Sequence, residues 1–305
     1  MDDELVRRLE ELKRRRRAVI LAHNYQLPEI QDVADYIGDS LELARKSMDI
    51  DADVIVFAGV SFMAEMAKAL NPDKIVLHPV PNSRCPLADF LTPQQILEAK
   101  EKYNGAPFII YVNSNIDAKA VSDYIVTSAS AAKLVSRLGD ELILLGPDKN
   151  LADHTASMTG KKIIAVPSNG HCPVHEYMVR VEDIIEARKR YENPYIMVHP
   201  EAPREARQAA DYVGSTSQML RRIGEVEAGT YVIGTEEGLV YRARKLYPGK
   251  NIVALQPRAV CIDMKKMSLR RIVESLENMK PRVELEPTML KKVNEILRRS
   301  LELIR

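Results

Sequence analysis

The chain repeats one pattern of polar and apolar residues three times, at intervals of about 88 residues. The tripeptide Asp35-Tyr36-Ile37 recurs as Asp123-Tyr124-Ile125 and as Asp211-Tyr212-Val213. Later in each repeat, apolar runs end near a glycine and a proline, and a cysteine follows a few residues on. These cysteines are Cys85, Cys172 and Cys261. We therefore expect three copies of one structural unit.

Each repeat alternates short runs rich in Val and Ile with helical stretches. In the first repeat the runs are residues 18–22, 54–58 and 75–77, and helical stretches at 41–48 and 62–70 lie between them. Continuous apolar strands that alternate with helices are typical of a parallel sheet covered on both faces. Further helices are expected at 4–16, 92–103 and 180–191, which open the repeats, and at 268–279 and 287–304.

The predicted fold is α/β, with three similar three-layer α/β/α units that have parallel sheets and are related by pseudo-threefold symmetry around a central cavity. The expected units are residues 1–86, 87–173 and 174–262. The C-terminal helices, residues 263–305, are expected to pack back on these units. In parallel α/β sheets the functional loops follow the carboxyl ends of the strands, so equivalent loops of the three units are expected to share one cavity.

Composition limits the classes of partner. The 305 residues carry 44 Lys and Arg against 43 Asp and Glu, and this balance gives no general electrostatic reason to bind nucleic acid. No apolar run approaches the roughly 18 residues that cross a bilayer. The acidic start shows no secretory signal, and the basic run 13–17 is expected to be the last turn of the first helix. We expect a cytoplasmic protein with no nucleic-acid or membrane partner.

The three cysteines indicate a metal site rather than disulfides. Their number is odd, and a cytoplasmic protein keeps its thiols reduced. Soft thiolates select zinc, copper(I) or iron–sulfur clusters. A four-iron cluster with three thiolate ligands keeps one iron open to substrate. Zinc with three ligands and a water also fits, because His171 and His175 stand beside Cys172.

Other polar side chains follow the predicted strands at equivalent positions. Aromatic rings or imidazoles come first, then mixed donors two residues later, then hydroxyls. In that order they are His23, Tyr111 and His199; Tyr25, Asn113 and Glu201; and Ser40, Ser128 and Thr216. The hydroxyls either cap helices or hold an anion with several carboxylates or a phosphate. Tyr25 and Glu201 are a plausible acid–base pair, whereas the turn cluster 146–150 is expected to be mostly structural.

Taken together, these motifs resemble the quinolinate synthase family over essentially the whole chain. The matching segments are Ala22-His23-Asn24-Tyr25-Gln26, Ile37-Gly38-Asp39-Ser40, Tyr111-Val112-Asn113-Ser114, Val126-Thr127-Ser128-Ala129, the run from Gly146 to Ala152, Gly170-His171-Cys172-Pro173-Val174-His175, Val198-His199-Pro200-Glu201, Gly214-Ser215-Thr216 and Cys261-Ile262-Asp263-Met264-Lys265. One departure is Leu87, where a methionine is common in the family.

The resemblance implies a trefoil of three α/β/α units around one 4Fe–4S cluster, which Cys85, Cys172 and Cys261 would bind. It implies condensation of iminoaspartate (iminosuccinate) with dihydroxyacetone phosphate to quinolinate, phosphate and water, in de novo NAD biosynthesis. An aspartate oxidase or aspartate dehydrogenase would then be a functional link. The implied substrate-binding residues are His23, Ser40, Tyr111, Val112, Asn113, Ser128, His199, Pro200, Glu201 and Thr216. The implied catalytic residues are Tyr25, Tyr111, His199 and Glu201.

Three alternatives stay open at this point. Another three-cysteine 4Fe–4S trefoil enzyme, like hydroxymethylbutenyl diphosphate reductase or the diphthamide radical enzymes, would need an electron donor or S-adenosylmethionine. A zinc hydrolase would lack iron. A non-catalytic iron–sulfur sensor or carrier would have little use for the acid–base groups at the strand ends.

Overall fold

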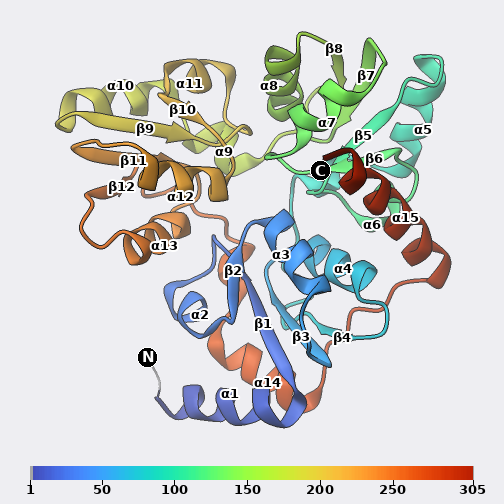
Figure 1. Cartoon of the computed structure of the whole chain (residues 1–305), viewed down its shortest axis with the longest axis vertical. Helices are drawn as coiled ribbons and strands as arrows, with labels where there is room; N and C mark the ends of the chain where they lie inside the picture. The colour runs from blue at the N-terminus through green and yellow to red at the C-terminus, as the bar shows by residue number, and fades with distance from the viewer. Residues whose placement is uncertain (1–2, 305) are drawn as a thin grey trace. The chain divides into compact units, whose positions relative to one another are not determined.

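The computed structural model describes residues 3–304, and among them lie three parallel four-stranded sheets (Figure 1). All three sheets have the same strand order, β2-β1-β3-β4, β6-β5-β7-β8 and β10-β9-β11-β12. Their bounds are β1 Ala18–His23, β2 Tyr36–Gly38, β3 Val54–Ala58, β4 Ile75–Leu77, β5 Phe108–Tyr111, β6 Tyr124–Val126, β7 Leu142–Gly146, β8 Lys162–Ala165, β9 Pro194–Val198, β10 Tyr212–Val213, β11 Thr230–Gly234 and β12 Ile252–Ala254. The prediction of an α/β fold with three similar units is confirmed.

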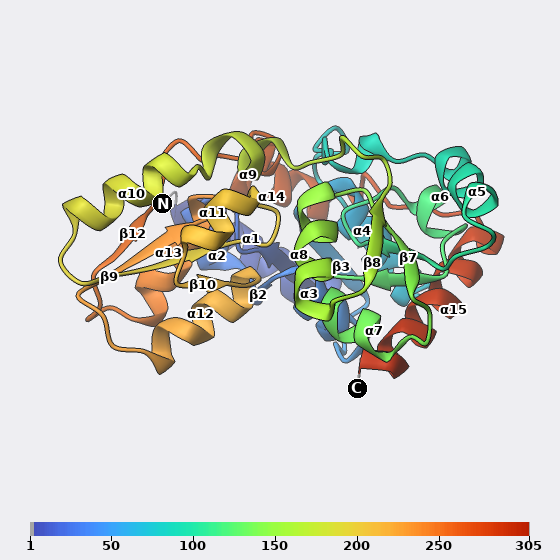
Figure 2. The same ribbon diagram turned by 90° about the horizontal axis from the view of Figure 1, so that it is seen from above.

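Helices alternate with the strands in each repeat. Their bounds are α1 Asp3–Arg16, α2 Pro28–Val33, α3 Ser40–Met48, α4 Ser61–Leu70, α5 Pro93–Lys102, α6 Ile116–Lys119, α7 Ala131–Arg137, α8 Lys149–Thr159, α9 Pro173–Met178, α10 Val181–Arg190, α11 Arg204–Ala209, α12 Thr216–Glu225, α13 Gly238–Leu246, α14 Leu269–Asn278 and α15 Pro287–Ile304. Figure 2 shows the sheet β9–β12 with α10 and α11 on one face and α12 on the other.

The repeated aspartate of the tripeptide ties three elements together in each unit. Asp35 accepts a hydrogen bond from the Ile20 amide at 2.7 Å, and its own amide donates back to the Ile20 carbonyl at 3.0 Å. The same exchange joins Asp123 to Phe108 and Asp211 to Ile196. A cation from the helix that opens each repeat also pairs with this aspartate, and we call the whole arrangement the aspartate clasp. The cations are Lys13, Lys100 and Arg188, at 2.8, 2.8 and 2.9 Å. The aspartate of the repeated tripeptide therefore has a structural role in each unit.

The first sheet is covered on one face by helices from both ends of the chain. Helices α1 and α14 pack against each other, and α14 also contacts β3. Leu9 and Leu12 of α1 share an apolar core with Ile272 and Leu276 of α14. Figure 1 shows α1 and α14 below the strands of this unit and α3 and α4 on the other face. A helix that stands in register with the repeat-opening helices thus completes the first unit.

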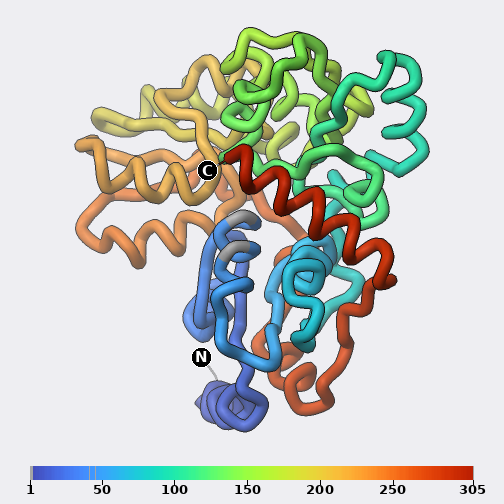
Figure 3. Tube along the Cα trace, turned by 45° about the vertical axis from the view of Figure 1, so that its right-hand side comes forward, coloured from blue at the N-terminus to red at the C-terminus, as the bar shows by residue number. Residues whose placement is uncertain are grey.

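The chain divides into two compact units, one of residues Met1–Cys85 with Cys261–Asn294 and one of Pro86–Val260 with Glu295–Arg305. Each sheet lies inside one of the predicted units, although the boundaries 1–86, 87–173, 174–262 and 263–305 stay a prediction. The expected tail helix is confirmed as α15, which Figure 3 shows in red as one continuous helix. No helix among residues 3–304 combines the length and the apolar character that a membrane span needs.

Candidate functional site

Two of the three cysteines lie on loops that hydrogen-bond to each other within the first compact unit. Ser83 donates through Oγ to the Asp263 carbonyl at 2.6 Å. The Arg84 amide donates to the Asp263 carboxylate at 3.2 Å. Cys85 directly follows Arg84 and Cys261 precedes Asp263 by two residues, and both cysteines are half-buried and free of disulfides. The fold therefore holds two of the proposed metal ligands on adjacent loops.

The loop after β1 joins this pair of loops. Lys265 Nζ donates to the Tyr25 carbonyl at 2.7 Å. The Gln26 side chain lies 3.7 Å from Met264 Sδ. His23 Nδ1 accepts the Tyr25 amide at 3.2 Å, and the two rings meet edge to face with centroids 4.5 Å apart. His23 and Tyr25 are thus fixed in one local arrangement, next to the segment that carries Cys261.

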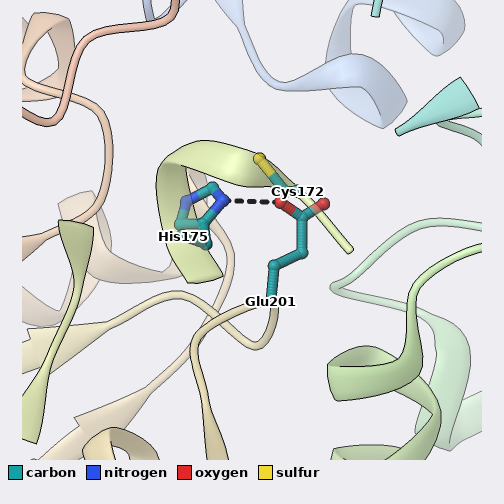
Figure 4. Close-up of side chains that lie close together, drawn as sticks. All are labelled: Cys172, His175 and Glu201. Carbon is teal, nitrogen blue, oxygen red and sulfur yellow. Dashed lines mark ion pairs between the residues drawn. The ribbon is translucent and has the colours of Figure 1, made fainter. Parts of the chain in front are cut away.

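The second compact unit brings together Cys172, His175 and Glu201 (Figure 4). One ligand atom from each residue lies within 4.8 Å of the others, a spacing at which they could hold a metal ion. Cys172 directly precedes α9, so that His175 follows it in the first turn of this helix. His175 Nδ1 lies 2.6 Å from Glu201 Oε2, and Figure 4 shows the two side chains pointing toward each other.

Glu201 is the point where the second and third repeats meet. Its side chain is only 2% exposed, and Asn113 donates to its Oε1 at 3.2 Å. His199 Nδ1 lies 3.7 Å from Oε2 and its ring stacks on that of His175, with centroids 4.7 Å apart. Burial alone raises the pKa of Glu201, but the charges of protonated His175 and His199, with a hydrogen bond to Tyr111, outweigh burial and lower it. Glu201 is therefore held as a carboxylate.

His175 is held from its other side by Thr235. His175 Nε2 and Thr235 Oγ1 are 2.8 Å apart, and both residues are at most 2% exposed. Our site prediction omitted Thr235 and named His175 as a candidate zinc ligand. The sequence could have pointed to both residues as site residues. Thr235 directly follows β11, and His175 lies three residues after Cys172 in the same motif.

The turn after β7 also supports the group formed by Cys172, His175 and Glu201. The turn was expected to be mostly structural, and this contact adds to that role. Asp148 accepts the Leu151 amide at 2.7 Å and so caps α8, and it also accepts the Cys172 amide at 3.2 Å. Burial, and then the charge of Glu201, raise the pKa of Asp148 well above its usual value. Asn150 donates to the Glu201 carbonyl at 2.9 Å and to Glu176 at 2.8 Å.

Two glycines let the backbone come close beside Cys172. A Cβ atom on Gly146 would lie 1.9 Å from the Val166 carbonyl oxygen. A Cβ atom on Gly170 would lie 2.0 Å from the Pro147 oxygen. Any larger residue at either position would push the loops after β7 and β8 apart, since the contacted atoms belong to backbone.

The capping role considered for the three hydroxyl residues is wrong. Helix α12 is capped by Ser215, in a capping box with Gln218, and α7 begins after Ser130. In α3 the carboxylate of Asp39 accepts the Glu42 amide at 3.0 Å. In α12 and α3 the residue directly before the predicted one does the capping, because a cap must lie just outside the helix, whereas Ser130 makes no side-chain cap hydrogen bond to α7. Ser40 and Thr216 are instead the first residues of their helices, and Ser128 precedes Ser130 by two positions.

The predicted site residues thus fall into two groups. His23 and Tyr25 lie in the first compact unit with Cys85 and Cys261, and the second unit holds the other group. That group contains Tyr111, Asn113, Cys172, His199 and Glu201. Val112 and Pro200 are buried in the same loops, with the Val112 amide bonded to the Val126 carbonyl at 2.7 Å. The binding roles assigned to all of these residues stay predictions.

A triplicated α/β fold with thiol, imidazole and carboxylate groups gathered after the strands defines an enzyme of the parallel α/β class, with a donor set suited to a metal. The model of one family, described as Quinolinate synthetase A protein, matches residues 7–302. The chain belongs to this family.

Curated relatives agree over nearly the full length of both chains. The quinolinate synthase of Thermococcus kodakarensis is 50% identical over 301 residues, which cover 99% of each chain. That of Pyrococcus horikoshii is 50% identical over 300 residues, covering 98% of this chain and 99% of its own. That of Thermotoga maritima is 43% identical over 304 residues, covering 100% of both.

Proposed function

We propose that this chain is a quinolinate synthase that condenses iminoaspartate with dihydroxyacetone phosphate to quinolinate, phosphate and two molecules of water. The observation that carries the proposal is family membership over residues 7–302, with relatives named quinolinate synthase across nearly the whole chain. The site supports it, because a buried carboxylate flanked by two imidazoles suits repeated proton transfers. The product would enter NAD biosynthesis.

Cys85, Cys172 and Cys261 are proposed to hold one 4Fe–4S cluster. The donors fit, since all three are free cysteines and two of them stand on hydrogen-bonded loops. When bound, such a cluster supplies a Lewis acid that makes hydroxide a better leaving group. Reduced thiols of this kind suit the cytoplasm, where we expect the enzyme to work.

The proposed roles of the chain's own residues follow from their surroundings. Glu201 is proposed to accept a proton, since its neighbours keep it deprotonated, and because its lowered pKa makes it a weak base, the imidazoles beside it would take that proton on. Asn113 fixes the orientation of that carboxylate, and His175 and His199 can take and return protons beside it. Tyr25 is proposed as a proton donor, and Tyr111 and His199 as further catalytic groups.

Binding of the two substrates calls for anion sites, since together they bring two carboxylates and a phosphate. We propose the residues that the family resemblance implies: His23, Ser40, Tyr111, Val112, Asn113, Ser128, His199, Pro200, Glu201 and Thr216. Ser40 and Thr216 support this assignment as first-turn residues, because amides at a helix N-terminus favour negative charge. Iminoaspartate must come from oxidation of aspartate, so an aspartate oxidase or dehydrogenase is the proposed functional partner.

A zinc enzyme is the second candidate, and the Cys172–His175–Glu201 group favours it. Three such ligands with one open position are typical of catalytic zinc. Metal analysis of protein purified without oxygen separates the two proposals. About four irons per chain would support the cluster, and stoichiometric zinc with no iron would contradict it.

The activity test supplies both proposed substrates to the anaerobic protein. We expect quinolinate and phosphate in equal amounts, measured by chromatography and a phosphate assay. Omitting either substrate is the control. Absence of quinolinate from cluster-loaded protein would contradict the proposed function.

A further inference from the structure

Each repeat buries one long polar side chain at the same position of its second helix. These residues are Gln31 in α2, Lys119 in α6 and Arg207 in α11, spaced by about 88 residues. Their exposed fractions are 3%, 0% and 7%. A lysine or arginine is rarely buried to this extent. The three side chains differ in charge and shape, but each is long and carries an N–H donor.

All three side chains donate to the carbonyl of the residue five positions earlier. Gln31 Nε2 donates to the Gln26 carbonyl at 2.9 Å, and Arg207 Nε donates to the Ala202 carbonyl at 2.9 Å. Lys119 Nζ donates to the Ser114 carbonyl at 2.5 Å. The same contact is therefore made by an amide, an ammonium and a guanidinium group.

The carbonyl that is held ends the short loop after the first strand of each sheet. These loops are residues 23–26, 111–114 and 199–202, and each begins at or just after the end of β1, β5 or β9. They carry the proposed site residues His23 and Tyr25, Tyr111 and Asn113, and His199 and Glu201. The strand fixes where each loop starts, and the buried donor fixes where it ends.

Packing alone does not account for these side chains. Burying a charged group is costly unless it is hydrogen-bonded or paired, and an apolar side chain of similar length would fill the same space. Arg207 also pairs with Asp153 at 2.5 Å, but Gln31 has no charge to pair. The one feature that we find at all three positions is the hydrogen bond to the loop carbonyl, so we take this bond as the reason for the buried polar side chain.

We infer that Gln31, Lys119 and Arg207 are positioning residues, one per repeat, that hold the substrate-contacting loops in their working geometry. This inference rests on the proposed function, because it assigns those loops to the active site. Lys119 is the most informative of the three. It holds the loop from which Asn113 reaches Glu201 at 3.2 Å.

The chain itself offers matched variants for Lys119. Lys119→Met keeps an unbranched side chain but removes the N–H donors. Lys119→Gln and Lys119→Arg restore a donor, as found at the two equivalent positions. We expect Lys119→Met to keep its iron and lower kcat by about 10-fold or more, since small misplacements of reacting groups are costly. The Gln and Arg variants should recover to within about 3-fold of the unaltered enzyme, with KM changed less than kcat in all variants.

Hydrogen exchange of the peptide that covers residues 111–115 gives a readout without substrate. We expect faster exchange in Lys119→Met and unaltered exchange in Lys119→Gln. This result separates the two proposals, since it can hold even where the unaltered protein makes no quinolinate. Equal exchange and equal turnover in Lys119→Met and the unaltered chain would overturn the inference.

Gln31→Met provides a second test of the inference in case Lys119→Met does not fold. It removes an uncharged donor with little change of size, and Gln31→Lys restores a donor. If Lys119→Met does not fold, the inference stands on slower turnover and faster exchange of residues 23–26 in Gln31→Met, both recovered in Gln31→Lys. Loss of folding in both Met variants would show that these residues serve stability, and the inference would be wrong.

Discussion

At the scale of single residues, the site depends on how the neighbours of one carboxylate set its charge. Glu201 is buried, and burial by itself would favour the protonated acid. The imidazoles of His175 and His199 reverse this preference when they are protonated. A sequence gives the order of these residues but not their distances, so the sign of the pKa shift became clear only from the structure.

Glu201→Gln tests this carboxylate directly. The amide keeps the shape of the side chain but can neither take a proton nor attract the imidazoles. We expect quinolinate formation to fall by about 10²-fold or more, the usual scale for losing a proton-transfer group. Steady-state rates and iron content of anaerobic protein are the measurements. Full iron with turnover within a few-fold of the unaltered enzyme would show that Glu201 only binds or packs.

Thr235→Val tests the orientation of His175. The change is nearly isosteric and removes the hydroxyl that lies 2.8 Å from His175 Nε2. We expect kcat to fall by about 10-fold while KM changes little, because a misdirected imidazole affects proton transfer more than binding. Thr235→Ser keeps the hydroxyl and is the control. Equal losses in both variants would argue for a packing defect instead.

At the scale of elements, the sequence pattern predicted the aliphatic strands of the first repeat and the repeat-opening helices, but it missed the second strand of each sheet. The apolar runs and the repeat-opening helices appear at the expected places, as β1, β3 and β4 and as α1, α5 and α10 show. The strands β2, β6 and β10 were not predicted, because each is short and begins with a tyrosine, whereas β4, which is as short as β2 and β6, is an unbroken aliphatic run. The caps of α3 and α12 were missed by one residue, because capping depends on where the backbone enters the helix, and α7 has no side-chain cap.

The aspartate clasp is expected to act on stability alone. Asp123→Ala leaves the Phe108 amide without its side-chain acceptor and Lys100 without its partner. We expect a loss of about 1–3 kcal/mol in the free energy of unfolding, the range for an unsatisfied buried donor. Denaturant unfolding measures it. Lys100→Met, which removes only the ion pair, should cost less than about 1 kcal/mol. A fall in kcat of the folded Asp123→Ala protein would contradict a purely structural role.

Gly170→Ala tests the close backbone approach beside Cys172. The new Cβ atom would meet the Pro147 oxygen at 2.0 Å, so the Cys172 loop must move. We expect the variant to lose most of its iron, measured after anaerobic purification. Gly139→Ala is a matched control, since nothing lies within 4 Å of its Cβ position. Iron content in Gly170→Ala equal to that of the control would show that the loop tolerates the shift.

At the scale of the whole molecule, the three cysteines do not all lie in one compact unit. Cys85 and Cys261 belong to one unit and Cys172 to the other. The repeat predicted the three equivalent loops, since each cysteine follows the last strand of its sheet. Local patterns in a sequence carry no information on how separate units meet, so the pseudo-threefold arrangement around one cluster stays a prediction.

Replacing the cysteines one at a time tests whether one cluster takes all three thiolates. Three ligands leave no spare thiolate, so Cys85→Ala, Cys172→Ala and Cys261→Ala should each lose the cluster and the activity together. Because a bound group stabilises the folded state that binds it, the unaltered protein should also melt at a lower temperature once its iron is removed. The measurements are iron content, absorbance of the anaerobic protein and thermal unfolding. Ser136→Ala is the control, because the Ser136 hydroxyl donates to the Ala132 carbonyl of its own helix at 2.8 Å. If Cys172→Ala kept its iron while Cys85→Ala and Cys261→Ala lost theirs, Cys172 would not be a cluster ligand, and the single-cluster proposal would be wrong.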